Sequence, residues 1–210
     1  MLHYEKMAHL IAESVGQLFK KDSYLFANSV HETCINHRLA IYLEELVPKY
    51  FDDNCNQLSV DLEYNRRMLE DNSPRKMEIS SGTSLFMGGN TIEPKRLRPD
   101  IVIHQRDNCD RDLLWLEVKI GSDPYICEKD VSKIYHACLQ LNFKLVASIL
   151  IDYPENLLWI WCLSYAEPIE EYVFGYTDGD ISCCKATLET KLVPHSLLIR
   201  IDKEGKYSCQ

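Results

Sequence analysis

The apolar segment 113–120 contains only two charged side chains and constrains the fold of this chain more than any other feature. Successive side chains of an extended strand point to opposite faces, so Glu117 and Lys119 share one face. The opposite face carries only apolar side chains: Leu114, Leu116, Val118 and Ile120. An acid and an amine inside a buried strand are costly unless they pair or bind something. The segment therefore predicts a central strand that carries an ion pair or a binding site.

A second strand is predicted at 100–104, where an apolar run begins with the carboxylate Asp100 directly after Pro99. The polar residues 106–111 separate this run from 113–120. A polar turn between two strand-length segments predicts that the strands pair as a hairpin. The two charged positions of the later strand are therefore expected beside Asp100.

Two carboxylates and a lysine on adjacent strands suit phosphodiester hydrolysis. Asp100 and Glu117 would supply hard oxygen ligands for Mg²⁺ or Mn²⁺, with the carbonyl of Val118 as a third. The metal would polarise a phosphate and help generate hydroxide, and Lys119 would orient that water or stabilise charge on the phosphate oxygens. The structural alternative is an ion pair between Glu117 and Lys119 on an exposed sheet face.

The remaining elements follow from hydrophobic periodicity. Helical spacing predicts helices over residues 1–21, 27–47 and 128–141, and Pro48 is expected to end the second. Strands are predicted over 58–64, 144–152 and 157–163, with a strand pair about the turn 177–180 and a further short strand in the tail. Loop-forming residues dominate 66–95, a segment long enough to suggest function or partial disorder.

This order of elements, with Pro99-Asp100 on the second strand and Glu117-Val118-Lys119 on the third, resembles the PD-(D/E)XK nuclease superfamily, which includes restriction endonucleases and Holliday-junction resolvases. Segments 31–40, 60–66 and 98–104 are similar to small uncharacterised bacterial members. The resemblance implies an α/β fold with a restriction-endonuclease-like αβββαβ core at about 25–152 and a mixed central sheet flanked by helices. We expect one domain over 1–210, with an extra N-terminal helix and C-terminal strands from 153 to 210.

The same resemblance implies a metal-dependent endonuclease, with DNA favoured over RNA and defence against foreign DNA as one expected role. Glu32 matches an acidic helix residue that many members use as an extra or water-mediated metal contact, although a solvated helix carboxylate is an equal alternative. Glu63 is expected to approach the catalytic site from the first strand, whereas its face-mate Asp61 is expected to be an exposed polar residue. His104 is expected to be structural.

Expected nucleic-acid contacts are Arg66, Arg98, Lys133 and Gln140, with an ion pair as the alternative for Arg66. The net charge of −9 argues against binding through overall basicity. Segment 64–106, however, carries eight basic against five acidic residues, and we expect it to border the substrate. The acidic balance elsewhere suggests that a homodimer or a partner protein completes the binding groove.

The sequence contains no secretory start and no apolar run long enough to cross a bilayer, so a cytoplasmic protein without membrane contact is expected. The nine cysteines form no CxxC pair. Cys34, Cys138 and Cys162 are expected to be small buried side chains in a reducing compartment. The adjacent Cys183 and Cys184 have no functional explanation.

Two other functions stay open. A catalytically silent nuclease-fold module could act in nucleic-acid or protein binding within a larger complex. Loss of catalysis usually removes one of the three central residues, and Asp100, Glu117 and Lys119 are all present. An assembly protein with an acidic surface would explain the net charge, but it leaves the charged pair in segment 113–120 unexplained.

Overall fold

The computed structural model describes residues 3–51, 58–64, 66–68, 74–76, 98–106, 112–122, 134, 137–138, 141, 143–165, 173–177, 180–184, 192–201 and 204–209. Within them the helices are α1 (His3–Ala27) and α2 (Glu32–Tyr50). The strands are β1 (Ser59–Leu62), β2 (Arg66–Met68), β3 (Pro74–Lys76), β4 (Ile101–His104), β5 (Leu114–Ile120), β6 (Leu145–Asp152), β7 (Leu157–Tyr165), β8 (Val173–Thr177), β9 (Asp180–Cys184), β10 (Leu192–Ile201) and β11 (Tyr207–Cys209). The chain is therefore α/β.

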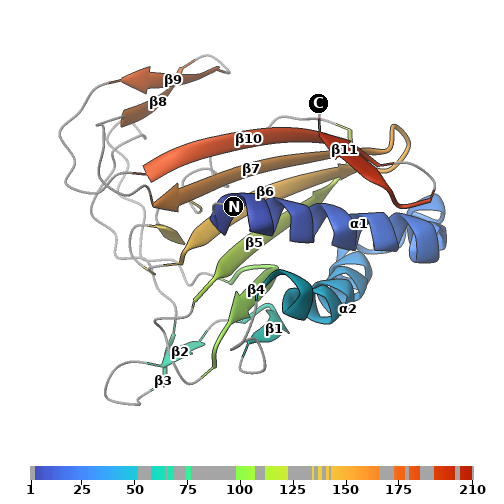
Figure 1. Ribbon diagram of the computed structural model, residues 1–210, viewed down its shortest axis with the longest axis horizontal. Helices are drawn as coiled ribbons and strands as arrows, with labels where there is room; N and C mark the ends of the chain where they lie inside the picture. Colours follow the sequence, from blue (N-terminus) through green and yellow to red (C-terminus); the bar gives the residue numbers. More distant parts are fainter. Residues whose placement is uncertain are drawn as a thin grey trace.

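Seven strands form one mixed sheet in the order β1-β4-β5-β6-β7-β10-β11 (Figure 1). Strands β4 and β5 are antiparallel, as the hairpin prediction requires, with Ile101 opposite Leu116. Strands β5 and β6 are parallel, and the other neighbours in the sheet are antiparallel. Two separate antiparallel pairs, β2–β3 and β8–β9, complete the strands that the structure describes. The sheet places β5 near its centre.

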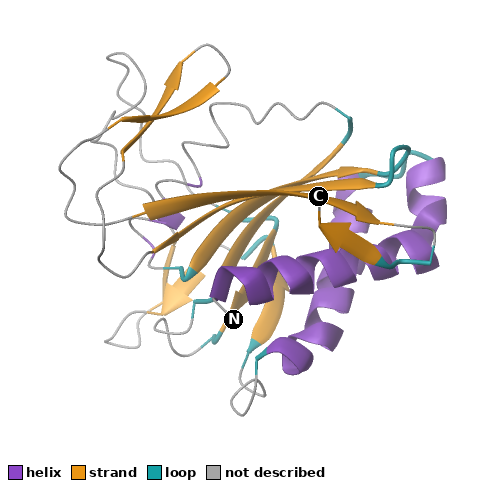
Figure 2. Cartoon of the chain, turned by 45° about the horizontal axis from the view of Figure 1, so that its top comes forward, coloured by secondary structure: helices purple, strands orange, loops and turns teal. Residues whose placement is uncertain are grey.

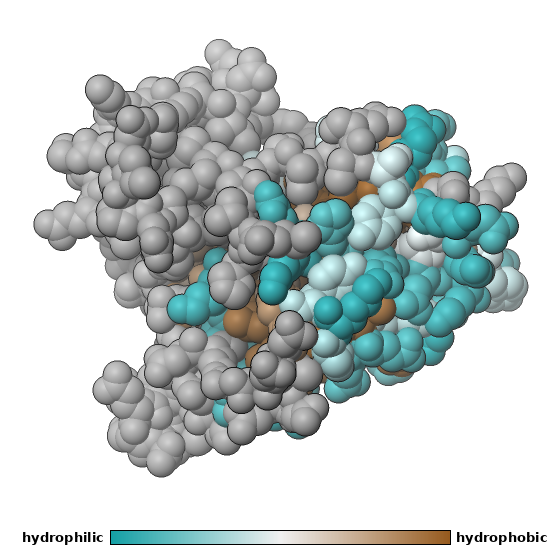
Figure 3. All heavy atoms as spheres, viewed as in Figure 1, coloured by the Kyte–Doolittle hydropathy of each residue, from teal (hydrophilic) through white to brown (hydrophobic). Residues whose placement is uncertain are grey.

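Helices α1 and α2 cover one face of the sheet (Figure 2), because each carries an apolar stripe. The core between the helices and the sheet includes Leu10 and Leu39 from the helices and Leu114, Leu116 and Val118 from β5. Figure 3 shows mostly hydrophilic residues on the outer surface of these helices. The predicted apolar face of segment 113–120 is thus confirmed as the face under the helices.

A second core lies on the opposite face of the sheet. Its members are Val102, Trp115, Ile134, Ala137, Cys138, Leu141, Phe143, Val146 and Trp161. Residues 134, 137, 138 and 141 are helical, in agreement with the predicted helix over 128–141 as far as the described residues extend. Because side chains alternate along β5, Glu117 and Lys119 lie on this second face with Trp115.

Both helices end later than predicted, and α2 begins at Glu32 rather than at residue 27 because α1 continues to Ala27. Helix α1 continues to Ala27 through a kink at Asp22, near its predicted end. Helix α2 begins at Glu32 and includes Pro48, so the prediction that Pro48 ends it was wrong. The residues after Pro48 are tied to α1, because Lys49 and Tyr50 both donate hydrogen bonds to Glu13. These tertiary contacts stabilise a last turn that local propensity does not favour.

Other sequence predictions are corrected by the strand boundaries. Strand β1 ends at Leu62, so the predicted strand over 58–64 was too long, and Glu63 has a positive φ of 49°. Residues 74–76 form a strand where loop structure was predicted. Strand β10 is ten residues long and joins the main sheet, so the predicted short strand was also wrong. Cys34 is exposed, so the prediction that it is buried was wrong, whereas Cys138 and Cys162 are buried as predicted.

The C-terminal strands pack against α1. The ring Nδ1 of His9 lies 3.0 Å from the hydroxyl of Tyr207. Gly16 lies so close to Gly205 that a Cβ on Gly16 would stand 2.2 Å from the Gly205 carbonyl oxygen. Gly205 also has a positive φ of 77°, which favours glycine. Among the described residues, neither helix has the length and apolar character needed to span a membrane.

Candidate functional site

The candidate site lies at the C-terminal end of β5, on the edge that faces β4 but extends past its first residue. Strand β4 begins at Ile101, whose partner is Leu116, so Val118 and Ile120 extend past the paired part of the hairpin. The backbone N–H of Val118 donates to Oδ2 of Asp100 at 2.8 Å. The backbone N–H of Ile120 bonds to the carboxylate of Glu32. Carboxylates from α2 and from the start of β4 therefore satisfy successive donors of one strand edge.

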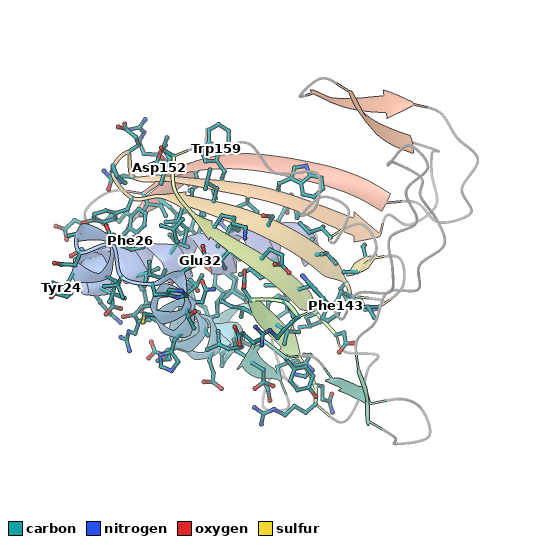
Figure 4. The ribbon with its side chains drawn as sticks, turned by 180° about the vertical axis from the view of Figure 1, so that it is seen from behind. Tyr24, Phe26, Glu32, Phe143, Asp152 and Trp159 are labelled. Carbon is teal, nitrogen blue, oxygen red and sulfur yellow. The ribbon has the colours of Figure 1, made fainter. Side chains whose placement is uncertain are left out.

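We call Glu32, Asp100, Val118, Lys119 and Ile120 the β5 edge site. Glu32, labelled in Figure 4, comes from the first turn of α2. Burial raises the pKa of Glu32 above its usual value; the charge of Lys119 opposes this shift, and the charge of Asp100 adds to it. These three charged groups are thus near enough to interact. The structure thus brings Glu32 near Asp100 and Lys119, while its predicted role as a metal contact stays a prediction.

Glu117 has different surroundings from the other carboxylates. It is only 2% exposed, and its Oε1 accepts a hydrogen bond from Trp115 Nε1 at 2.7 Å. Trp115 in turn packs edge-on against Phe143, which is labelled in Figure 4. Extending the hairpin register by one residue places Asp100 opposite Glu117. Glu117 is therefore a buried carboxylate next to the β5 edge site, and it accepts a hydrogen bond from an indole.

Glu63 and Arg98 interact with each other beside the site. Arg98 Nη1 lies 3.2 Å from Glu63 Oε2, and both side chains are about half exposed. The backbone N–H of Glu63 donates to the carbonyl of Asp100 at 3.1 Å. The backbones of Glu63 and Asp100 are therefore hydrogen-bonded to each other, but the Glu63 carboxylate pairs with Arg98 at the surface.

Asp61, His104 and Arg106 form a second charged group, which we call the Asp61 cluster. Arg106 donates to both carboxylate oxygens of Asp61, at 2.9 and 2.5 Å, and His104 Nε2 lies 2.9 Å from Asp61 Oδ2. The prediction that Asp61 is an exposed polar residue was wrong, because its side chain is only 18% exposed. His104 is buried, which agrees with its predicted structural role.

The pKa shifts in this cluster have clear causes. The hydrogen bonds from Arg106 are the main reason that the pKa of Asp61 is lowered, and His104 adds to the effect. Burial lowers the pKa of His104, which favours the neutral ring. Because an ionised Asp61 carboxylate can only accept, Nε2 is the donor in this hydrogen bond. The sequence did not reveal this group, since its three members come from different positions that only the β1–β4 pairing brings together.

Three predicted nucleic-acid contacts remain without side-chain placement. Lys133 and Gln140 lie outside the described residues. Arg66 belongs to β2, where its backbone pairs with Lys76, and its side chain is not among those described.

Asn36 is a residue near the site that the sequence interpretation missed. It is buried on α2, four residues after Glu32, and its Oδ1 has no hydrogen-bond partner among the described residues. The available signal was a polar residue next to Ile35 in an otherwise apolar helix face. Buried polar atoms are usually satisfied, so an exception calls for an explanation.

The oxygen donors of the β5 edge site suit a hard cation. Among the described residues, no three His, Cys, Asp or Glu side chains are grouped closely enough to hold a metal by themselves. Mg²⁺, however, is commonly bound by one or two carboxylates, with water and substrate phosphates completing its shell. Asp100 and Glu32 provide two carboxylates at one strand edge. The N–H and C=O of one strand residue point to the same side, so the Val118 carbonyl is directed toward this edge too.

Comparison of the chain with protein-family models, curated proteins and solved structures finds no match in any of the three. The geometry of the site and the sequence pattern are therefore the basis for a functional assignment.

Proposed function

We propose that this chain is a metal-dependent nuclease of the PD-(D/E)XK type that hydrolyses phosphodiester bonds in nucleic acid, with DNA favoured over RNA. The observation that carries the proposal is the β5 edge site. There Asp100 binds the N–H of Val118, Glu32 binds the N–H of Ile120, and Lys119 lies between these two positions along β5.

The order of elements supports the proposal. In the seven-stranded sheet, α2 is followed by β1, β4 and β5, then by the helical residues 134, 137, 138 and 141 and by β6. With the separate β2–β3 pair set aside, this is the αβββαβ order that the family resemblance implies. Strand β6 is parallel to β5. The helical residues lie between these two strands in the sequence and pack against the sheet. This arrangement presents the end of β5, with Lys119, beside the first turn of α2.

Asp100, Glu32 and the Val118 carbonyl would hold the Mg²⁺ or Mn²⁺ ion, with Glu117 as a further carboxylate next to them. When bound, such an ion polarises a phosphate and lowers the pKa of a water molecule. Lys119 is exposed and acts on the charge of Glu32, and in this proposal its ammonium group would stabilise the phosphate oxygen on which charge develops. The partly buried Glu32 resists ionisation without a positive charge beside it, which favours a cation at this edge.

One observation favours the second candidate function, a catalytically silent module that binds nucleic acid or protein. Glu117 is buried and accepts a hydrogen bond from Trp115, so its carboxylate already has a structural partner. Under this alternative, Glu117 serves the core of the domain, and the charged groups at the β5 edge site stabilise the end of the hairpin. The two functions differ in whether purified protein cleaves a substrate.

The test is cleavage of supercoiled plasmid and of RNA by purified full-length protein with Mg²⁺, Mn²⁺ or EDTA. The proposal expects metal-dependent cleavage that EDTA abolishes and that Asp100→Asn and Lys119→Ala remove. Lys144→Ala is a matched control, because Lys144 is also exposed but lies just before β6, beside the start of β5 and at the opposite end of that strand from Lys119. Equal cleavage by the wild type and by both site variants would show that the mechanism is wrong.

A further inference from the structure

Asn36 combines burial with an unsatisfied polar atom. The residue is 6% exposed, and its Oδ1 has no hydrogen-bond partner among the residues that the structure describes. A buried acceptor without a partner costs about 1–3 kcal/mol. An apolar side chain of similar size would avoid that cost. The amide oxygen of Asn36 therefore needs a hydrogen-bond donor from outside the described residues.

The position of Asn36 indicates where such a ligand lies. Residues four apart in a helix occupy the same face, so Asn36 shares a face with Glu32. Helical side chains tilt toward the N-terminus, which directs the Asn36 amide over the turn that contains Glu32. The Glu32 carboxylate bonds to Ile120 at the end of β5. The Asn36 amide and the Glu32 carboxylate therefore lie one turn apart on the face of α2 that packs against the sheet.

We propose that Asn36 is a positioning residue of the metal site: its Oδ1 accepts a hydrogen bond from a water molecule in the hydration shell of the cation beside Glu32. This inference rests on the proposed function. Mg²⁺ keeps several of its water molecules in proteins, and each of them needs an acceptor. A neutral amide oxygen supplies one without adding a third negative charge to Glu32 and Asp100. Losing a residue that hydrogen-bonds to a ligand of a metal typically lowers the metal affinity by about 10–100-fold.

The experiment measures Mn²⁺ affinity of the full chain by electron paramagnetic resonance, without substrate. Asn36→Leu keeps the approximate volume and removes the oxygen, and we expect it to weaken Mn²⁺ binding by about tenfold or more. Asn36→Ala removes the oxygen with less steric demand, so it provides the same test if the leucine variant does not fold. Asn36→Asp retains an acceptor and is expected to retain binding.

Two measurements separate a positioning role from a structural one. The free energy of unfolding in EDTA should stay equal or rise in Asn36→Leu, since an unsatisfied polar atom is removed. The matched control is Gln105→Leu, which changes a second buried amide side chain just after β4 and should leave Mn²⁺ affinity unchanged.

The outcomes distinguish this inference from the proposed function. If the wild type binds no Mn²⁺, the metal site fails, and the role of Asn36 fails with it. If the wild type binds Mn²⁺ and both Asn36→Leu and Asn36→Ala bind it equally well, the inference about Asn36 is overturned while the proposed function stands. An equal loss of affinity in Gln105→Leu would also overturn it, because the effect would then not be specific to the site.

Discussion

The β5 edge site and the Asp61 cluster both contain carboxylates on or beside the β1–β4–β5 part of the sheet, but their charges are balanced differently. Asp61 is bonded by the side chains of Arg106 and His104, and its pKa is lowered. Glu32 is bonded by the backbone N–H of Ile120, and its pKa is raised by burial and by Asp100. The ionised form is favoured in the first region and disfavoured in the second.

This difference separates a structural group from a candidate functional one. In the Asp61 cluster, the protein itself supplies the positive charge that the carboxylate needs. At the β5 edge site, Lys119 offsets only part of the unfavourable surroundings of Glu32. Perturbed carboxylates of this kind gather at functional sites, where a ligand completes the balance. Substitutions in the two regions should therefore affect different properties of the protein.

The largest expected effect is on catalysis. Asp100→Asn, which keeps an oxygen for the N–H of Val118, and Lys119→Ala should each reduce the plasmid cleavage rate by about 10²–10³-fold or more. Their free energies of unfolding should change little. The corresponding variant of the other region, Asp61→Ala, should retain the cleavage rate of the wild type per folded molecule. A strong loss of cleavage in Asp61→Ala would contradict the division between the two regions.

The next effect is on stability. Asp61→Ala removes the bonds from Arg106 and leaves buried His104 without its carboxylate acceptor, so we expect a loss of about 2 kcal/mol in the free energy of unfolding. Urea denaturation measures this change. Glu45→Ala, an exposed carboxylate of α2, provides the control and should alter stability by less than about 0.5 kcal/mol. Equal free energies of unfolding for Asp61→Ala and Glu45→Ala would show that the Asp61 cluster has no special role in stability.

The third expectation concerns the pH dependence of stability. His104 has a lowered pKa in the folded state, so its contribution is present above its unfolded value of about 6.5 and is lost as pH falls below it. The lowered pKa of Asp61 adds a second loss that begins below its unfolded value of about 3.9.

Urea denaturation at a series of pH values tests both contributions. Asp61→Asn should lack the loss below about pH 3.9 and keep a loss below about pH 6.5, because burial is the main cause of the His104 shift. Identical pH profiles for the wild type and Asp61→Asn would show that the Asp61 pKa is not shifted by folding.

The smallest expected effect concerns Arg98 and Glu63, which form an exposed pair next to the β5 edge site. Arg98→Ala should change stability by less than about 1 kcal/mol, because exposed ion pairs contribute little. If Arg98 contacts a phosphate, the same variant should reduce the slope of the logarithm of the DNA-binding constant against the logarithm of salt concentration by about one. Fluorescence anisotropy with a labelled duplex at several salt concentrations measures this slope. An unchanged slope would remove Arg98 from the nucleic-acid contacts.

The elements with a strong local pattern were predictable from the sequence. The alternation in segment 113–120 assigned Leu116 and Glu117 to opposite faces, and the polar turn predicted the antiparallel pairing of β4 with β5. Predictions failed where a distant contact overrides local preference. Pro48 remains inside α2 because the following residues bond to Glu13, a residue of α1. Asp61 was misjudged because its partner Arg106 follows a different strand.

The sequence by itself determined which side chains share a face, because the repeats of helices and strands are local and depend only on backbone geometry. It therefore placed Glu117 and Lys119 together and predicted an apolar core beneath β5. Only the tertiary structure decided which of these groups meet residues from elsewhere in the chain. Packing of α2 against the sheet brings Glu32 to Ile120 and leaves the Asn36 amide buried, since distances between separate elements are set by how their side chains fill the core.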